Sequence, residues 1–67
     1  MISYEPLRKT LKERNLNISD LRNDRGGFLS TSTVTKLNKD KNLEMTMIEK
    51  ICLELDIPVE KVLKIVK

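Results

Sequence analysis

Short hydroxyl side chains cluster in residues 30–36, which read Ser-Thr-Ser-Thr-Val-Thr-Lys. This segment follows Gly26-Gly27, a pair that permits a sharp reversal of the backbone. Ser30 can cap a helix, and Val34 and Leu37 would then lie on one buried face of that helix. The other hydroxyl groups and the lysine would face solvent as a row of hydrogen-bonding side chains that ends in a cation. Such a face suits base edges and phosphates.

No other set of residues offers comparable chemistry. The chain has no histidine and one cysteine, so an ordinary zinc site lacks ligands and an internal disulfide is excluded. Cys52 lies at an apolar position of an expected helix with nothing to activate it, so we expect it to pack rather than react. Scattered carboxylates have helical spacing and lysine neighbours, which is typical of a solvated surface. The sequence therefore predicts no enzyme, no metal and no cofactor.

The charges are unevenly distributed, although the net charge is only +3. Residues 1–42 carry nine cations and five anions, a balance of +4, whereas residues 43–60 carry one cation and five anions, a balance of −4. The last seven residues add three lysines. This asymmetry would give one basic face for a polyanion, but an ordinary solvated helical surface would also explain it.

Length and composition favour a small helical protein. A chain of 67 residues allows one domain at most, and its stability must come from apolar packing because disulfides and metals are excluded. The core residues are mostly aliphatic, which fits packed helices, so we expect an all-α fold. No apolar run approaches the roughly 18 residues needed to span a bilayer, and the N-terminus lacks the order of a signal peptide. We therefore expect a cytoplasmic protein.

Apolar spacing and turn residues predict a compact bundle of five short helices. The first begins at residue 3 or 4 and ends near residue 14, and the second begins at residue 17 and lasts about two turns. The third spans residues 31–38, the fourth spans residues 45–55, and the fifth begins at Pro58 with an apolar side formed by Val59, Val62, Leu63 and Val66.

Several residues are expected to end or anchor these helices. Asn15 suits a left-handed position after the first helix, with Leu16 folding back as an apolar plug. Asn17 and Asp20 are spaced as a capping pair for the second helix. Met45 and Met47, which lie in the fourth helix, are expected to fill the core.

Three motifs together resemble the Cro/lambda-repressor type (Xre) helix-turn-helix family, in particular its small stand-alone members. They are Ile2-Ser3-Tyr4-Glu5-Pro6-Leu7, Thr33-Val34-Thr35-Lys36-Leu37 and Lys50-Ile51-Cys52, and the resemblance covers nearly the whole chain. It implies a lambda-repressor-like DNA-binding domain in which helices two and three form the binding unit. The third helix would then enter the major groove of double-stranded DNA.

The resemblance also implies which side chains touch DNA. The base-reading candidates are Thr31, Ser32, Thr35 and Lys36, and the phosphate-binding candidates are Asn17, Thr33, Lys39 and Lys41. Two departures from the family pattern stand out. The turn Arg25-Gly26-Gly27-Phe28-Leu29 is about two residues longer than usual, and Ile18 replaces the polar residue that commonly follows the helix-two cap.

Taken together, these observations predict a transcriptional regulator, with repression as its expected mode and no small-molecule effector. The contact made by one such small unit is limited, so a homodimer on a two-fold-related site is expected. The apolar tail, residues 62–66, either forms the dimer surface or closes the monomer core. The alternative is a protein-interaction module on the same scaffold, such as a mobile-element protein that binds a host enzyme or another regulator, and salt dependence would separate the two.

Overall fold

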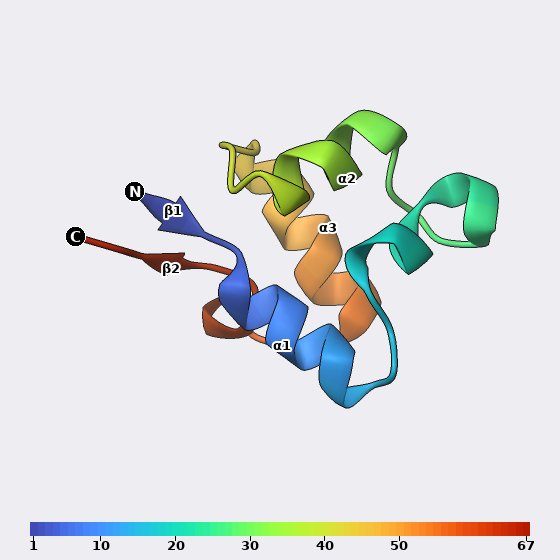
Figure 1. Cartoon of the computed structure of the whole chain (residues 1–67), viewed down its shortest axis with the longest axis horizontal. Coiled ribbons are helices and arrows are strands. Elements are labelled where there is room, and N and C mark those ends of the chain that lie inside the picture. The colour runs from blue at the N-terminus through green and yellow to red at the C-terminus, as the bar shows by residue number, and fades with distance from the viewer.

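The computed structural model describes all 67 residues as three α-helices, three short 3₁₀ turns and a two-stranded sheet (Figure 1). The helices are α1 (Glu5–Glu13), α2 (Thr31–Asn38) and α3 (Met45–Leu55). The 3₁₀ turns are η1 (Ile18–Leu21), η2 (Asn23–Arg25) and η3 (Val59–Lys61), and the strands are β1 (Ile2–Ser3) and β2 (Lys64–Ile65).

Helix α1 ends as the sequence predicts. Asn15 has a φ of 59°, and the backbone N–H groups of Asn15 and Leu16 donate to the carbonyls of Lys12 and Leu11 at 3.0 and 2.8 Å. This pattern satisfies two carbonyls at the end of the helix. The side chain of Leu16, however, is 38% exposed and is not the apolar plug that we expected, although its backbone folds back.

The predicted second helix is wrong in type and length. The capping pair is present, because the side chains of Asn17 and Asp20 each accept a hydrogen bond from the other residue's backbone N–H. The turn nevertheless stops at Arg22, whose ψ is 144°. Leu29 explains the break, since its N–H donates to the Leu21 carbonyl at 2.9 Å and its own carbonyl accepts from Asn23. The backbone groups that a longer helix would pair internally are therefore already bonded to the strand-like segment at Leu29.

The predicted third and fourth helices are confirmed with the same bounds. The Ser30 side chain caps α2 by accepting from the Thr33 N–H. In α3 the buried stripe consists of Ile48, Ile51 and Leu55. Met45 was expected in the core and is instead 72% exposed, because it is the first residue of the helix and the buried stripe begins one turn later. Met47 and Cys52 are half-buried against the core.

The predicted fifth helix is also wrong. After one 3₁₀ turn the chain becomes extended, and β2 pairs antiparallel with β1 in a register that places Ile65 opposite Ile2. The β-branched residues Ile65 and Val66 favour extended backbone, and the first residues of the chain supply the partner strand. The fold is therefore mainly helical with a small sheet, rather than an all-α bundle of five helices.

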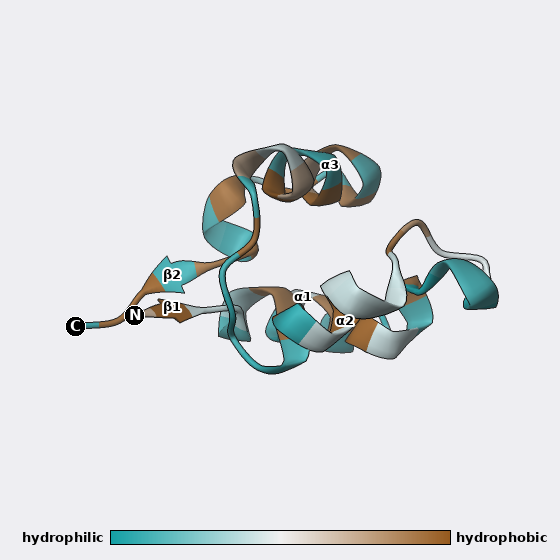
Figure 2. Ribbon diagram, turned by 90° about the horizontal axis from the view of Figure 1, so that it is seen from above, coloured by the Kyte–Doolittle hydropathy of each residue, from teal (hydrophilic) through white to brown (hydrophobic).

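The core lies between the helices α1 and α2 and the helix α3. Figure 2 shows α1 and α2 on one side and α3 on the other. The largest fully buried side chains come from every part of the chain and are Tyr4, Leu7, Leu11, Leu29, Leu37, Ile51 and Val62. The longest helix has only 11 residues, and none has the length and apolar character to cross a membrane.

Candidate nucleic-acid interface

Helix α2 turns one face into the core and the other to solvent. Val34 and Leu37 are buried, which fixes the rotation of the helix about its axis. The opposite face exposes the four side chains that the sequence identified as base-reading candidates, namely Thr31, Ser32, Thr35 and Lys36. The structure therefore brings these four residues together on one exposed surface.

The hydroxyl groups on this face differ in what they can still bond. The Thr35 hydroxyl donates to the Thr31 carbonyl at 3.0 Å, so it can accept a further hydrogen bond but has no proton left to give. The Ser32 hydroxyl lies 3.2 Å from the Ser30 hydroxyl and shares one bond with it. The Thr31 hydroxyl makes no hydrogen bond within the protein. The exposed face thus offers both donors and acceptors to a ligand.

Thr33 does not join this surface. Its side chain is only 7% exposed, and its hydroxyl lies 3.0 Å from the Ser30 hydroxyl, inside the capping arrangement of α2. Its hydrogen-bonding capacity is therefore used, at least in part, inside the protein. The sequence predicts a contact between Thr33 and the DNA backbone, and in the structure the Thr33 hydroxyl lies in the cap at the start of the helix.

Asn17 lies at the start of η1 and keeps part of its side chain free. The side-chain Oδ1 of Asn17 accepts from the Asp20 N–H at 3.2 Å, while the side-chain Nδ2 makes no hydrogen bond within the protein. The cap therefore fixes the orientation of the side chain, and the free NH₂ group can donate to an external acceptor.

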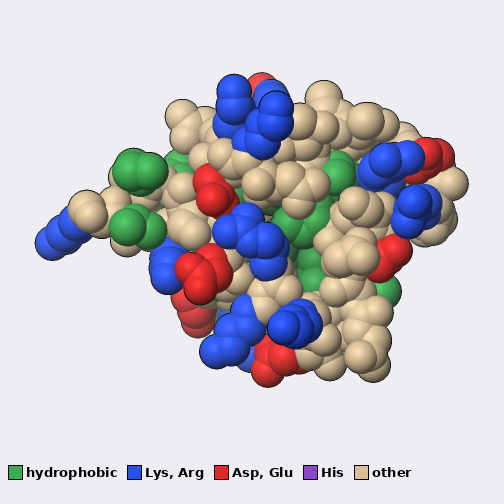
Figure 3. Space-filling view, in the orientation of Figure 1, with side chains coloured by type: hydrophobic (Ala, Val, Ile, Leu, Met, Phe, Trp, Pro, Cys, Tyr) green, Lys and Arg blue, Asp and Glu red, His purple; other side chains and the backbone are tan.

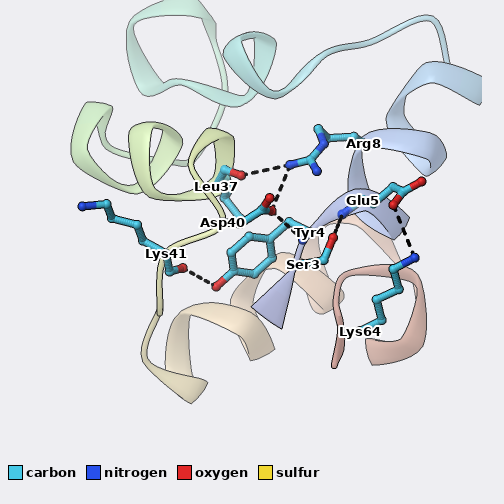
Figure 4. Close-up of polar contacts among 8 residues, drawn as sticks. All are labelled: Ser3, Tyr4, Glu5, Arg8, Leu37, Asp40, Lys41 and Lys64. Atoms are coloured by element: carbon cyan, nitrogen blue, oxygen red, sulfur yellow. Dashed lines mark hydrogen bonds and ion pairs between the residues drawn. The ribbon is translucent and has the colours of Figure 1, made fainter. Parts of the chain in front are cut away.

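The loop after α2 is held in place by Tyr4, Arg8 and Asp40 (Figure 4). One oxygen of Asp40 accepts from the Tyr4 backbone N–H at 2.8 Å and from Arg8 at 3.1 Å. Arg8 also donates to the Leu37 carbonyl at 3.3 Å, and the Tyr4 hydroxyl donates to the Lys41 carbonyl at 2.7 Å. These bonds tie the end of the exposed helix to the start of α1.

The protonation states of this cluster favour its hydrogen bonds. The Tyr4 N–H, and after it Arg8, hold the pKa of Asp40 below its ordinary value, so the carboxylate stays charged at neutral pH. Burial, with the charge of Asp40 adding to it, raises the pKa of Tyr4, so its hydroxyl keeps the proton that it donates.

Lys36, Lys39 and Lys41 are exposed and take part in none of the four ion pairs of the molecule. The long turn before α2 is different. Its cations Arg22 and Arg25 pair with Asp24 and Asp20. Figure 3 shows Lys and Arg side chains on several parts of the face that carries α1 and α2. Within residues 22–41, the cations that form no ion pair are therefore those on and after α2, and not those of the turn.

The structure adds basic residues that the sequence interpretation missed. A pocket of about 260 Å³ between α1, η1 and the end of α2 is lined by Arg8, Lys12, Leu16, Asn17, Ile18 and Asn38. Two cations and two amides can together hold an anionic group such as a phosphate. The spacing of Arg8 and Lys12 places them on one face of a helix, but no local pattern shows that this face meets residues 17 and 38.

Comparisons with known proteins agree with this geometry. The family model described as the Cro/C1-type HTH DNA-binding domain matches residues 6–67. The crystal structure of the transcriptional regulator VanUg is similar to this chain, with a TM-score of 0.80 and 32% sequence identity over 94% of this chain and 81% of that one. A comparison with curated proteins gives no match. The family model spans nearly the whole chain, and this protein therefore belongs to the Cro/C1-type family of helix-turn-helix DNA-binding domains.

Proposed function

We propose that this protein is a sequence-specific regulator of transcription that inserts α2 into the major groove of double-stranded DNA. One observation carries the proposal. Helix α2 is anchored in the core by Val34 and Leu37 and exposes three hydroxyl side chains and an unpaired lysine on the opposite face. Short polar side chains of this kind can reach base edges in a groove that admits a helix.

The exposed residues divide into two roles. Thr31, Ser32, Thr35 and Lys36 read base edges, with Lys36 donating to guanine O6 and N7 or to a phosphate. Asn17, Lys39 and Lys41 contact phosphates and fix the register of α2 on the duplex. The pocket lined by Arg8 and Lys12 supports an additional phosphate contact beside Asn17.

Repression through occupation of an operator is the mode that we propose. The similarity to VanUg, itself a transcriptional regulator, supports a regulatory role. A single unit of this size contacts few base pairs, so a homodimer would bind a two-fold-related site with half-sites about one helical turn apart.

Selection of bound DNA from a randomised duplex pool, at two salt concentrations, tests the proposal. The expected result is a two-fold-symmetric motif whose retention falls steeply with salt, because phosphate contacts release counterions. Retention without a motif, or no retention at the lower salt, would contradict sequence-specific readout. The same scaffold would then be serving as a protein-interaction module, an alternative that fits the modest net charge of +3.

A further inference from the structure

One side of α3 carries an apolar groove of about 530 Å³, lined by the helix and by the segment that follows it. The lining residues Ile48 and Ile57 are buried and lie at its base, with exposed fractions of 3% and 9%. Met45 and Val59 also line the groove and are 72% and 47% exposed. Exposed apolar side chains that gather in one place, instead of lying singly on the surface, are typical of an interaction site.

The backbone fixes the shape of this groove. Asp56 has a left-handed backbone with φ 54°, and the Ile57 N–H donates to the Cys52 carbonyl at 3.0 Å. These two features end α3 and turn the chain back, so that residues 57–59 line the same groove as the helix. Pro58 keeps the chain from continuing as a helix at this point. The groove is therefore built into the fold and does not depend on the position of one mobile side chain.

The rim of the groove is acidic. Glu49 lies among the lining residues, Glu44 directly precedes Met45, and Glu60 directly follows Val59. All three carboxylates are exposed and none belongs to an ion pair, while no lysine or arginine lines the groove. This rim repels the phosphates of DNA and attracts cationic side chains.

We propose that this groove binds an amphipathic helix of a partner protein, with aliphatic side chains in the groove and lysine or arginine side chains against the acidic rim. Such a helix presents its apolar residues as one stripe and its cations on the flanks, which matches the groove in shape and in charge. Met45 and Cys52 are two turns of α3 apart, about 10 Å, so a stripe of two to three turns fits between them. Their sulfur-containing side chains adapt easily to the surface of a partner. This site goes beyond the proposed function and does not depend on DNA binding.

A synthetic peptide of about 14 residues tests the proposal, with leucines at helical spacing and lysines on both flanks. A second peptide carries glutamate in place of every lysine, and a third has the composition of the first in an order that breaks the apolar stripe. Calorimetric titration of the full chain should show binding of the first peptide alone. The dissociation constant should be micromolar, because the groove is small.

Variants of α3 then locate the site on the protein. Met45→Gln and Glu49→Lys should each lower the affinity for the lysine peptide about tenfold, since one removes an apolar contact and the other places a cation at the rim. Leu53→Gln and Glu54→Lys are the matched controls, because they make the same kinds of change at exposed positions of α3 that do not line the groove. They should change the affinity by less than about twofold. All four replace exposed side chains, so the melting temperature should stay the same.

Three results would overturn the proposal: no binding of the lysine peptide, equal binding of the glutamate peptide, or equal losses in the groove variants and their controls. Sedimentation of the protein alone covers a further occupant. A dimer that Met45→Gln abolishes would mean that a second copy of the chain fills the groove, and the proposed partner helix would be wrong.

Discussion

At the scale of single residues, the proposed interface depends most on Lys36. Lys36 is exposed and in no ion pair, so Lys36→Ala should leave the fold intact. The loss of one cationic contact should weaken binding to the selected operator by about 1 to 3 kcal/mol. Lys50→Ala on α3 is the matched control, since it removes the same charge from an exposed helical position outside the proposed interface. Unchanged operator affinity in Lys36→Ala would remove this residue from the site.

Asp40 should make stability depend on pH. The Tyr4 N–H and Arg8 lower the pKa of Asp40 in the folded protein. The charged carboxylate therefore adds to the free energy of unfolding above the ordinary aspartate pKa of about 3.9. This stabilisation is lost as the pH falls through the lowered pKa. Asp40→Asn keeps a side chain that tolerates the left-handed backbone at φ 53° but loses the charge. The variant should melt below the wild type at neutral pH, and the two melting curves should converge in acid.

Asp56→Asn provides the comparison for Asp40. Asp56 also has a left-handed backbone, with φ 54°, but its side chain makes no ion pair or hydrogen bond. Its replacement should change the melting temperature little at any pH. An Asp40→Asn variant that behaves in the same way would show that the carboxylate does not stabilise the loop after α2.

At the scale of elements, the turn before α2 uses its two glycines for different reasons. A Cβ on Gly27 would overlap the backbone carbonyl of Leu21, whereas Gly26 has open space but a left-handed φ of 85°. Gly27→Ala should therefore destabilise the protein by about 3 kcal/mol or more, and Gly26→Ala by only about 1 to 2 kcal/mol. Denaturant unfolding measures both, and equal losses would contradict the close packing of residue 27 against Leu21.

The elements that could be predicted from the sequence are those whose caps and apolar spacing lie within the element itself or directly beside it. The Ser30 cap and the stripe Ile48, Ile51 and Leu55 define α2 and α3 within the segments that contain them. Strand β2 is different, because its apolar run is compatible with helix or strand and its partner Ile2 lies at the other end of the chain. The break at Arg22 likewise depends on Leu29, which no helical period reveals.

The same distinction applies to the candidate site. The exposed face of α2 follows from helical spacing, so Thr31, Ser32, Thr35 and Lys36 could be placed together from the sequence. The burial of Thr33 also follows from helical spacing, because Thr33 lies four residues before the buried Leu37 and therefore on the same face of α2. The pocket beside Asn17 depends on three separate segments coming together, and sequence spacing could not indicate it.

At the scale of the whole molecule, the uneven charge of the sequence becomes a difference between two sides. Helices α1 and α2 lie opposite α3 (Figure 2). The segment from residue 43 to residue 60, which includes α3, carries five acidic residues and one lysine. The acidic side would thus point away from a polyanion bound at α2, which lowers repulsion and favours one orientation of encounter.

The role of α2 in reading DNA is tested by mapping the surface of the protein that DNA touches. Backbone amide NMR of the isotope-labelled protein, titrated with a random-sequence duplex at low salt, reports every segment in one experiment. We predict the largest shift changes at Thr31, Ser32 and Lys36 and in the loop at residues 39–41, with little change around Leu53 on α3. Changes concentrated on α3, or none on α2, would contradict the account of α2 as the element that reads DNA.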